Sequence, residues 1–171
     1  MTMNEKRQIK YPNTDYFQFS NLNPKGNITG DCVIRAAAAV SSGGSWNDTY
    51  DALTELGKKT GRTPTDRKTY DKYLTTFGDC IRMKQPKHNN NTKVTCRELI
   101  DFYNELGMPN LKIFASVGAH HVTAILDTSF TDKPKYKVHD IWNCSNEKVG
   151  SYYIFFDYLN KPRESILEYK D

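Results

Sequence analysis

Cys32 stands where a thiol can become a nucleophile, directly after Gly30-Asp31 and directly before an alanine-rich run. The run predicts a helix over about residues 31–41, with Cys32 in its first turn. The N–H groups and positive dipole end of a helix stabilise a thiolate, and a lowered thiol pKa makes a cysteine reactive. Free cysteines are also among the most often buried residues, so this interpretation depends on whether the chain supplies partners for the thiol.

Two other cysteines lie in similar segments, so neither a Gly-Asp-Cys motif nor a helix start is by itself evidence for a reactive thiol. The segment 78–82 nearly repeats the Gly-Asp-Cys motif, but Pro86 follows soon after, so Cys80 is predicted to begin a short strand. Cys96 lies inside a capping box completed by Glu98, whose carboxylate disfavours a thiolate. We therefore interpret Cys96 as structural.

Possible partners for the Cys32 thiol occur in the second half of the chain. His120 and His121 open a predicted strand and must point to opposite faces, so only one of them can enter a given cleft. Asp140 and Asn143 lie at and just beyond the end of the next strand, on either side of Trp142. A carboxylate or amide there can orient an imidazole through its second nitrogen, and the indole can keep water off that hydrogen bond.

The order of a helix-start Cys, a strand-start His and an acid or amide on the following strand resembles papain-like cysteine peptidases. The chain is most similar to a group of small papain-like proteins of bacteriophages and prophages. Their motifs GDCxxRA, HxxA[IV] and DxW[DN] occur here at residues 30–36, 121–125 and 140–143. The similarity covers most of residues 23–156, and only the order and combination of the motifs are specific.

The resemblance implies a catalytic triad in which Cys32 is the nucleophile, His121 rather than His120 is the acid and base, and Asp140 orients the ring. Asn143 is the alternative third member, because papain uses an asparagine near a tryptophan. The implied substrate is a protein or peptide with an amide or thioester bond, and no cofactor or metal is expected.

One family feature is missing from the segment before the nucleophile. Papain relatives carry a glutamine there, which donates to the oxyanion, but residues 23–29 contain none. The backbone N–H of Cys32 and the side chain of Asn27 are the candidate donors. Loss of one such donor typically costs about two to three orders of magnitude in turnover.

The missing glutamine leaves two alternatives open. The chain fits a scaffold that has kept its shape but lost chemistry and serves as a host-interaction or anti-defence binding protein. It also fits an acyltransferase or a deamidase, because these reactions begin with the same thioester as hydrolysis.

Glycines, capping signals and hydrophobic periodicity predict an α+β protein with a single papain-like domain over residues 1–171. Four helices are expected in the first half: over 31–41 with Gly43-Gly44 after it, from Ser45 to before Gly61, over 66–77, and from Thr95 to Gly107. Four strands, over 111–117, 121–127, 136–140 and 152–157, are expected to form an antiparallel sheet under the helices. Residues 1–30 are predicted to be an extended arm and 158–171 a charged tail, with the arm and the loop 86–94 as lid candidates.

The charge and the cysteine spacing of the chain indicate its partners and its cellular location. The net charge of +4 is mild and the basic residues are dispersed among acids, which disfavours a nucleic-acid partner. The four cysteines form no CxxC pair, and no apolar segment follows the N-terminal residues. We therefore expect free thiols in a cytoplasmic location, that of the host if the protein is phage-encoded, with no membrane segment. The sequence carries no signal for an oligomeric state.

Overall fold

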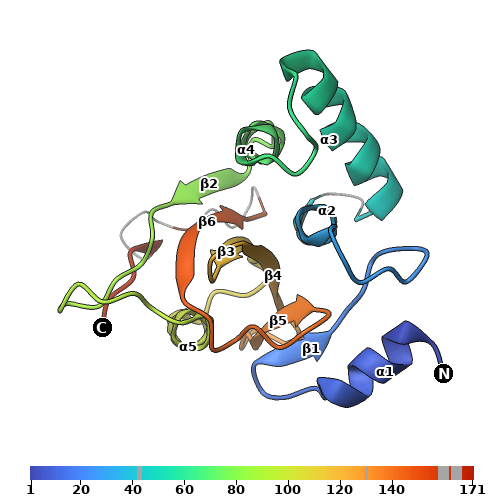
Figure 1. Ribbon diagram of the computed structural model, residues 1–171. Helices are drawn as coiled ribbons and strands as arrows, with labels where there is room; N and C mark the ends of the chain where they lie inside the picture. Colours follow the sequence, from blue (N-terminus) through green and yellow to red (C-terminus); the bar gives the residue numbers. More distant parts are fainter. Residues whose placement is uncertain (42–43, 130, 158–161, 163–166) are drawn as a thin grey trace.

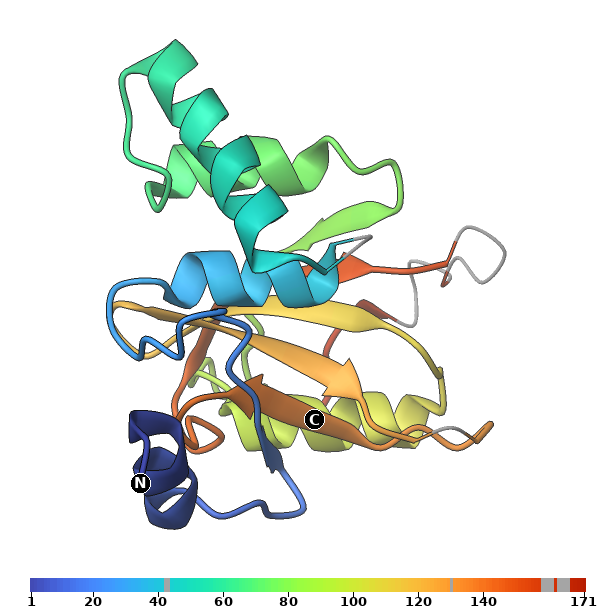
Figure 2. The ribbon, with the colours of Figure 1, turned by 90° about the vertical axis from the view of Figure 1, so that its right-hand side faces the viewer.

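The computed structural model describes residues 1–41, 44–129, 131–157, 162 and 167–171. Within these residues a six-stranded sheet has helices on both faces (Figure 1). The helices are α1 (Met3–Lys10), α2 (Cys32–Val40), α3 (Trp46–Thr60), α4 (Arg67–Thr75) and α5 (Cys96–Leu106). Figure 2 shows α2, α3 and α4 stacked on one side of the sheet and α5 on the other. The predicted α+β class is confirmed.

The sheet has the order β1-β5-β4-β3-β6-β2. Its strands are β1 (Phe17–Phe19), β2 (Cys80–Met83), β3 (Lys112–Val117), β4 (His121–Asp127), β5 (Tyr136–Asp140) and β6 (Val149–Phe155). All neighbours are antiparallel except β1 and β5, which run parallel, so the expectation of a purely antiparallel sheet is wrong. Both edge strands precede the four strands listed from the sequence: β2 begins at Cys80 as predicted, whereas β1 lies in the segment that was expected to be an extended arm.

The N-terminal segment is not simply an extended arm. It begins with α1, which opens with a capping box between Thr2 and Glu5, and it continues into β1. The Phe17 side chain of β1 is fully buried in the core. The pairing of β1 with β5 holds this segment against the sheet. Without β1, the outward-facing backbone N–H and C=O groups of β5 would have no partner strand.

The remaining predicted elements differ from the structure mainly at their ends. Helix α2 ends at Val40, before the expected glycine stop, and Gly43 lies outside the described residues. Strand β6 begins at Val149, three residues earlier than predicted. Cys80 does begin a short strand, and Gly107 ends α5 in the left-handed conformation, with φ of 70°.

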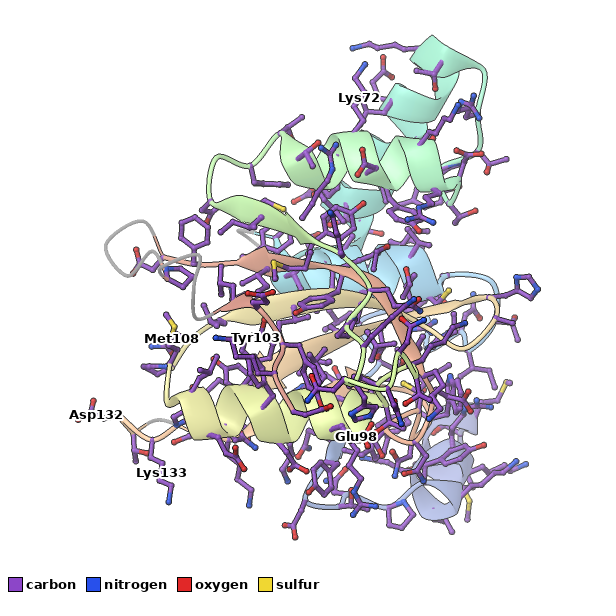
Figure 3. All side chains as sticks on the ribbon, turned by 90° about the vertical axis from the view of Figure 1, so that its left-hand side faces the viewer. Lys72, Glu98, Tyr103, Met108, Asp132 and Lys133 are labelled. Atoms are coloured by element: carbon purple, nitrogen blue, oxygen red, sulfur yellow. The ribbon has the colours of Figure 1, made fainter. Side chains whose placement is uncertain are left out.

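The two faces of the sheet bury separate apolar clusters. Helix α5 packs Leu99 and Tyr103 against one face, where the Tyr103 and Tyr152 hydroxyls lie 3.0 Å apart (Figure 3). On the other face, residues 36–38 of α2 are fully or almost fully buried alanines, and this helix packs against β4 and β3. The small methyl side chains let α2 lie close to the sheet, which brings its first turn beside the start of β4.

Most of the expected charged tail lies outside the described residues, and the described part is not simply solvated. Leu167 is buried in the core, and the Asp171 carboxylate accepts hydrogen bonds from His88 and from the backbone N–H of Asn89, both at 2.5 Å. These contacts hold the C-terminal residues against the loop 86–94.

Because Phe17 is part of the core, Phe17→Ala is expected to lower the free energy of unfolding by about 3–5 kcal/mol, the usual cost of a buried phenylalanine. Urea unfolding followed by circular dichroism measures the change. Gln18→Ala, in the same strand, is the matched control and is expected to cost less than about 1 kcal/mol. Equal small effects would mean that β1 is not part of the cooperative core.

Candidate active site

Cys32 is the first residue of α2, as predicted, and its side chain is partly exposed. The preceding residue, Asp31, occupies the N-cap position but makes no side-chain hydrogen bond to the helix. The first-turn N–H groups therefore have no capping side chain, and their partial positive charge stays available beside the thiol.

His121, the first residue of β4, joins the thiol to a buried carboxylate. Its Nε2 lies 2.6 Å from Oδ2 of Asp140, which is the last residue of β5 and only 4% exposed. The imidazole and the Cys32 thiol line the same pocket and lie close enough for each to shift the pKa of the other. The Trp142 ring lies 5.1 Å from the imidazole, centroid to centroid, and shields it. The structure thus brings together the three residues that the motifs singled out.

The pKa shifts of the pair are opposite in direction. Burial raises the pKa of the Cys32 thiol, but hydrogen bonds from His121 and from the Val122 backbone outweigh it, so the net pKa is lowered. Burial lowers the pKa of His121, but its hydrogen bonds to Asp140 and Cys32 prevail and raise the pKa to about 9. Both shifts favour a thiolate beside an imidazolium, which is the reactive form of a cysteine nucleophile.

The other three cysteines have the opposite environment. Burial raises the pKa of Cys80 and of Cys96 to about 12, and it raises that of Cys144 well above its ordinary value. All four side chains are free thiols. Cys32 is therefore the one cysteine of the four whose surroundings favour the thiolate.

Cys144 also approaches the triad, and His121, Asp140 and Cys144 offer ligand atoms within 4.8 Å of one another. The buried Cys144 thiol is neutral and lies 3.9 Å from Oδ2 of Asp140, the oxygen that also meets His121. Asp140 is committed further to a backbone N–H and an arginine, so this arrangement fits a hydrogen-bonded carboxylate better than a metal ligand.

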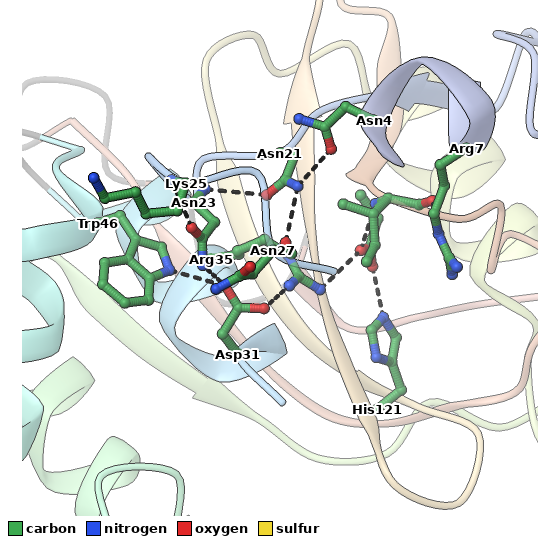
Figure 4. A network of polar contacts seen from close by, with 12 residues as sticks. Asn4, Arg7, Asn21, Asn23, Lys25, Asn27, Asp31, Arg35, Trp46 and His121 are labelled. Carbon is green, nitrogen blue, oxygen red and sulfur yellow. Dashed lines mark hydrogen bonds and ion pairs between the residues drawn. The ribbon is translucent and has the colours of Figure 1, made fainter. Parts of the chain in front are cut away.

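Arg35 links Asp140 to the helix that carries the nucleophile. Its guanidinium is paired with Asp31 on one side and lies 3.7 Å from Oδ1 of Asp140 on the other. The second Asp31 oxygen accepts from Asn23 at 2.8 Å and from the Trp46 indole at 3.0 Å (Figure 4). The Asp31 carboxylate oxygens thus accept from Arg35, Asn23 and Trp46 and not from the first-turn N–H groups of α2.

The N-terminal segment reaches the same strand end from outside. The Arg7 side chain donates to the Ile141 carbonyl at 2.8 Å, and the Ser20 N–H donates to the Asp140 carbonyl at 2.9 Å. The backbone at Asp140 and at the next residue is therefore held by the segment that the sequence assigned to an extended arm.

Three expected or alternative site residues lie differently. His120 is exposed, and Asn143 accepts hydrogen bonds from Ser145 rather than orienting His121. Asn27 is exposed, and its backbone carbonyl accepts from Asn21. Within the described residues, Asp140 is the group that contacts the second imidazole nitrogen.

A pocket of about 470 Å³ opens beside the thiol. Its wall is formed by the ends of α2, α4, β4 and β6 and by the turn before β4; the lining residues are Cys32, Val33, Thr65, Arg67, Tyr70, Ser116, Gly118, Ala119, His120, His121, Val122, Gly150 and Ser151. Asn27 and the two lid candidates, residues 1–30 and 86–94, are not part of this wall.

The contacts of Arg35 and Trp46 are what sequence reasoning missed. The spacing of Asp31 and Arg35 indicates an ion pair one helical turn apart, and this pair is present. Nothing in the local sequence shows that the same guanidinium reaches Asp140 or that the Trp46 indole meets Asp31, because both contacts depend on tertiary packing.

No family model, curated protein or solved structure matches this chain. Among the described residues, no helix is long and apolar enough to cross a membrane.

The opposite pKa shifts predict selective alkylation. At about pH 6, roughly two units below the ordinary thiol pKa, iodoacetamide is expected to modify Cys32 much faster than Cys80, Cys96 and Cys144. As the pH rises through about 9, His121 loses its proton and the rate at Cys32 should rise again, because a thiolate without its cation is more basic and more nucleophilic. Peptide mapping of timed samples gives the four rates.

In His121→Ala, burial dominates the thiol pKa, so the Cys32 rate at about pH 6 should fall by about tenfold or more. Equal rates at all four cysteines in the unmodified protein would contradict the assigned site.

The Arg35 network predicts a large stability effect. Arg35→Met leaves two buried carboxylates without their cation and is expected to cost about 3–5 kcal/mol of unfolding free energy. Asp31→Asn in that background should recover part of the loss. Arg62→Met, which breaks an exposed pair with Asp66 at 3.5 Å, is the control and should cost less than about 1 kcal/mol. Similar losses in both arginine variants, measured by urea unfolding, would rule out a special role for Arg35.

Proposed function

We propose that this protein is a small papain-like cysteine hydrolase of the bacteriophage type, which cleaves an amide or thioester bond in a protein or peptide. The observation that carries the proposal is the position of His121, whose Nε2 lies 2.6 Å from Asp140 and whose ring lies beside the Cys32 thiol in one pocket. A helix-start thiol with a lowered pKa and an oriented imidazole are the two parts that nucleophilic catalysis requires.

The reaction proceeds in two steps. The Cys32 thiolate attacks the carbonyl carbon, and the His121 imidazolium gives its proton to the leaving amine or thiolate as that bond breaks, which leaves an acyl group on the sulfur. Neutral His121 then takes a proton from water as the water oxygen attacks the thioester carbon. The C–S bond breaks, which releases the acid and restores the Cys32 thiolate beside the His121 imidazolium. Asp140 holds the ring and stabilises its positive charge throughout.

The oxyanion of each tetrahedral intermediate needs donors near the nucleophile. The uncapped first turn of α2 supplies backbone N–H groups, beginning with that of Cys32 itself. These groups are free of a competing side chain because Asp31 is turned toward Arg35. The α2 terminus thus offers a substitute for the missing glutamine, and Asn27 is a second donor only if a substrate draws its side chain inward.

The free thiols also indicate the cellular compartment in which the protein acts. A cysteine nucleophile with three further unpaired thiols suits a reducing compartment, so we place the protein in the cytoplasm, that of the host cell if it is phage-encoded.

A small activated ester tests the chemistry without knowledge of the natural substrate. With para-nitrophenyl acetate, we expect a burst of one nitrophenolate per chain, an acetyl group located on Cys32 by mass spectrometry, and slower steady release. Asp140→Asn should slow acylation about a hundredfold or more, because the imidazole loses its orientation and its counter-charge.

Cys32→Ser should abolish the burst. Cys80→Ser, in the other Gly-Asp-Cys segment, is the matched control and should keep it. A chain that folds but never acetylates Cys32 would instead be a binding scaffold, and transfer of the acetyl group to an added amine in preference to water would make it an acyltransferase.

A further inference from the structure

Basic residues outnumber acidic ones in the wall of the pocket beside Cys32. Arg67 and His120 belong to its lining, and none of the described aspartates and glutamates does. Gly118 and Gly150 also belong to the lining and add no side chain that would fill the space. The pocket therefore joins the reactive thiol to a guanidinium without an intervening carboxylate.

Arg67 is the first residue of α4, exposed, and turned toward the pocket by one neutral contact. Its Nη2 donates to the Ser151 hydroxyl of β6 at 2.9 Å, and it makes no ion pair with any described residue. The two nearby acids are occupied elsewhere. Asp71, one turn along α4, receives both arms of Arg82 at 2.9 and 2.7 Å, and Asp66 pairs with Arg62.

The two ends of the pocket differ in charge: Arg67 lies at one end, and a carboxylate lies near the other. At the turn before β4, a Cβ on Gly118 would lie only 3.1 Å from Oε2 of Glu147, so a carboxylate flanks that end. Tyr70, three residues along α4 from Arg67, also lines the pocket; it is buried, and burial raises the pKa of its hydroxyl, so it contributes a neutral side chain beside Arg67. An anionic group is thus favoured beside Arg67 and disfavoured near Gly118.

We infer that Arg67 binds a carboxylate of the substrate, so that the enzyme prefers an acidic residue close to the scissile bond. This inference rests on the proposed cysteine hydrolase. A guanidinium is suited to the role because its planar donors match both oxygens of a carboxylate. An acidic group would replace the Ser151 hydroxyl, or share Arg67 with it, when the peptide occupies the pocket.

Matched alkylating reagents test this without a known substrate. The probes are the N-iodoacetyl derivatives of glutamate amide and glutamine amide, and of aspartate amide and asparagine amide, so each pair differs in one charge. The measured quantity is the ratio of the acidic to the neutral alkylation rate at Cys32. The ratio cancels the intrinsic reactivity of the thiol, and comparison of the ratio between Arg67→Gln and the unmodified protein cancels the general attraction of His121 for anions.

In Arg67→Gln, at least one of the two ratios is expected to fall by about fivefold to tenfold, the range for a charge-assisted hydrogen bond at an exposed site. In the unmodified protein that ratio should also fall as salt is added. Lys68→Gln removes the same charge from the next residue of α4, which does not line the pocket, and should leave the ratio unchanged.

Unchanged ratios in Arg67→Gln, while Cys32 still reacts selectively with iodoacetamide, would overturn the acidic preference and leave the hydrolase intact. An equal fall in Lys68→Gln would also overturn it, because surface charge in general would then be the cause. Loss of the selective reaction in the unmodified protein would instead refute the hydrolase itself.

Discussion

A single buried guanidinium connects the parts of the candidate active site. Arg35 lies between Asp31, at the start of the nucleophile helix, and Asp140, at the end of the strand that orients His121. Two carboxylates so deeply buried repel each other and lose hydration, so the cation between them is what makes their close approach tolerable. The relative position of the Cys32 thiol and the His121 imidazole thus depends on the Arg35 guanidinium, which contacts neither of them. The Gly-Asp-Cys-x-x-Arg-Ala motif is accordingly a folding device as much as a catalytic one.

The chain contains its own comparison of two helix-start thiols. Cys32 and Cys96 are each the first residue of a helix, yet the pKa of one is lowered and that of the other is raised to about 12. At Cys96 the first-turn N–H groups already have partners: that of Glu98 donates to the Thr95 side chain, and those of Cys96 and Arg97 donate to the backbone carbonyls of residues 147 and 145. The Cys96 side chain is also fully buried. At Cys32 the cap residue is diverted to Arg35, and an imidazole stands opposite. The helix terminus alone therefore does not activate a thiol; a vacant cap and a cationic partner do.

The sequence predicted those parts whose signals are local. Periodicity and caps located α2 to α5, and the short motifs singled out Cys32, His121 and Asp140, which the fold brings together. It did not predict that Phe17 belongs to a strand of the sheet, because three residues of strand carry almost no pattern and the parallel pairing with β5 is set by the rest of the sheet. Helix α1 was missed although Thr2 and Glu5 spell a capping box, since its face buries nothing that would produce a hydrophobic stripe. The reach of Arg35 to Asp140 could not be predicted either, because it depends on how closely the alanine face of α2 approaches the sheet.

The strand order has a consequence for how the chain matures. The interior of the sheet is built from β3 to β6, whereas its two edges, β1 and β2, come from residues made earlier. During synthesis the early segments have no interior to join, so the nucleophile exists for a time as an ordinary thiol on an unsupported helix. Because most pairings join residues distant in sequence, the chain has the topology of a slow folder. Competence for chemistry is therefore a late event, acquired when β4 and β5 enter the sheet, and an unfinished chain carries no activated cysteine.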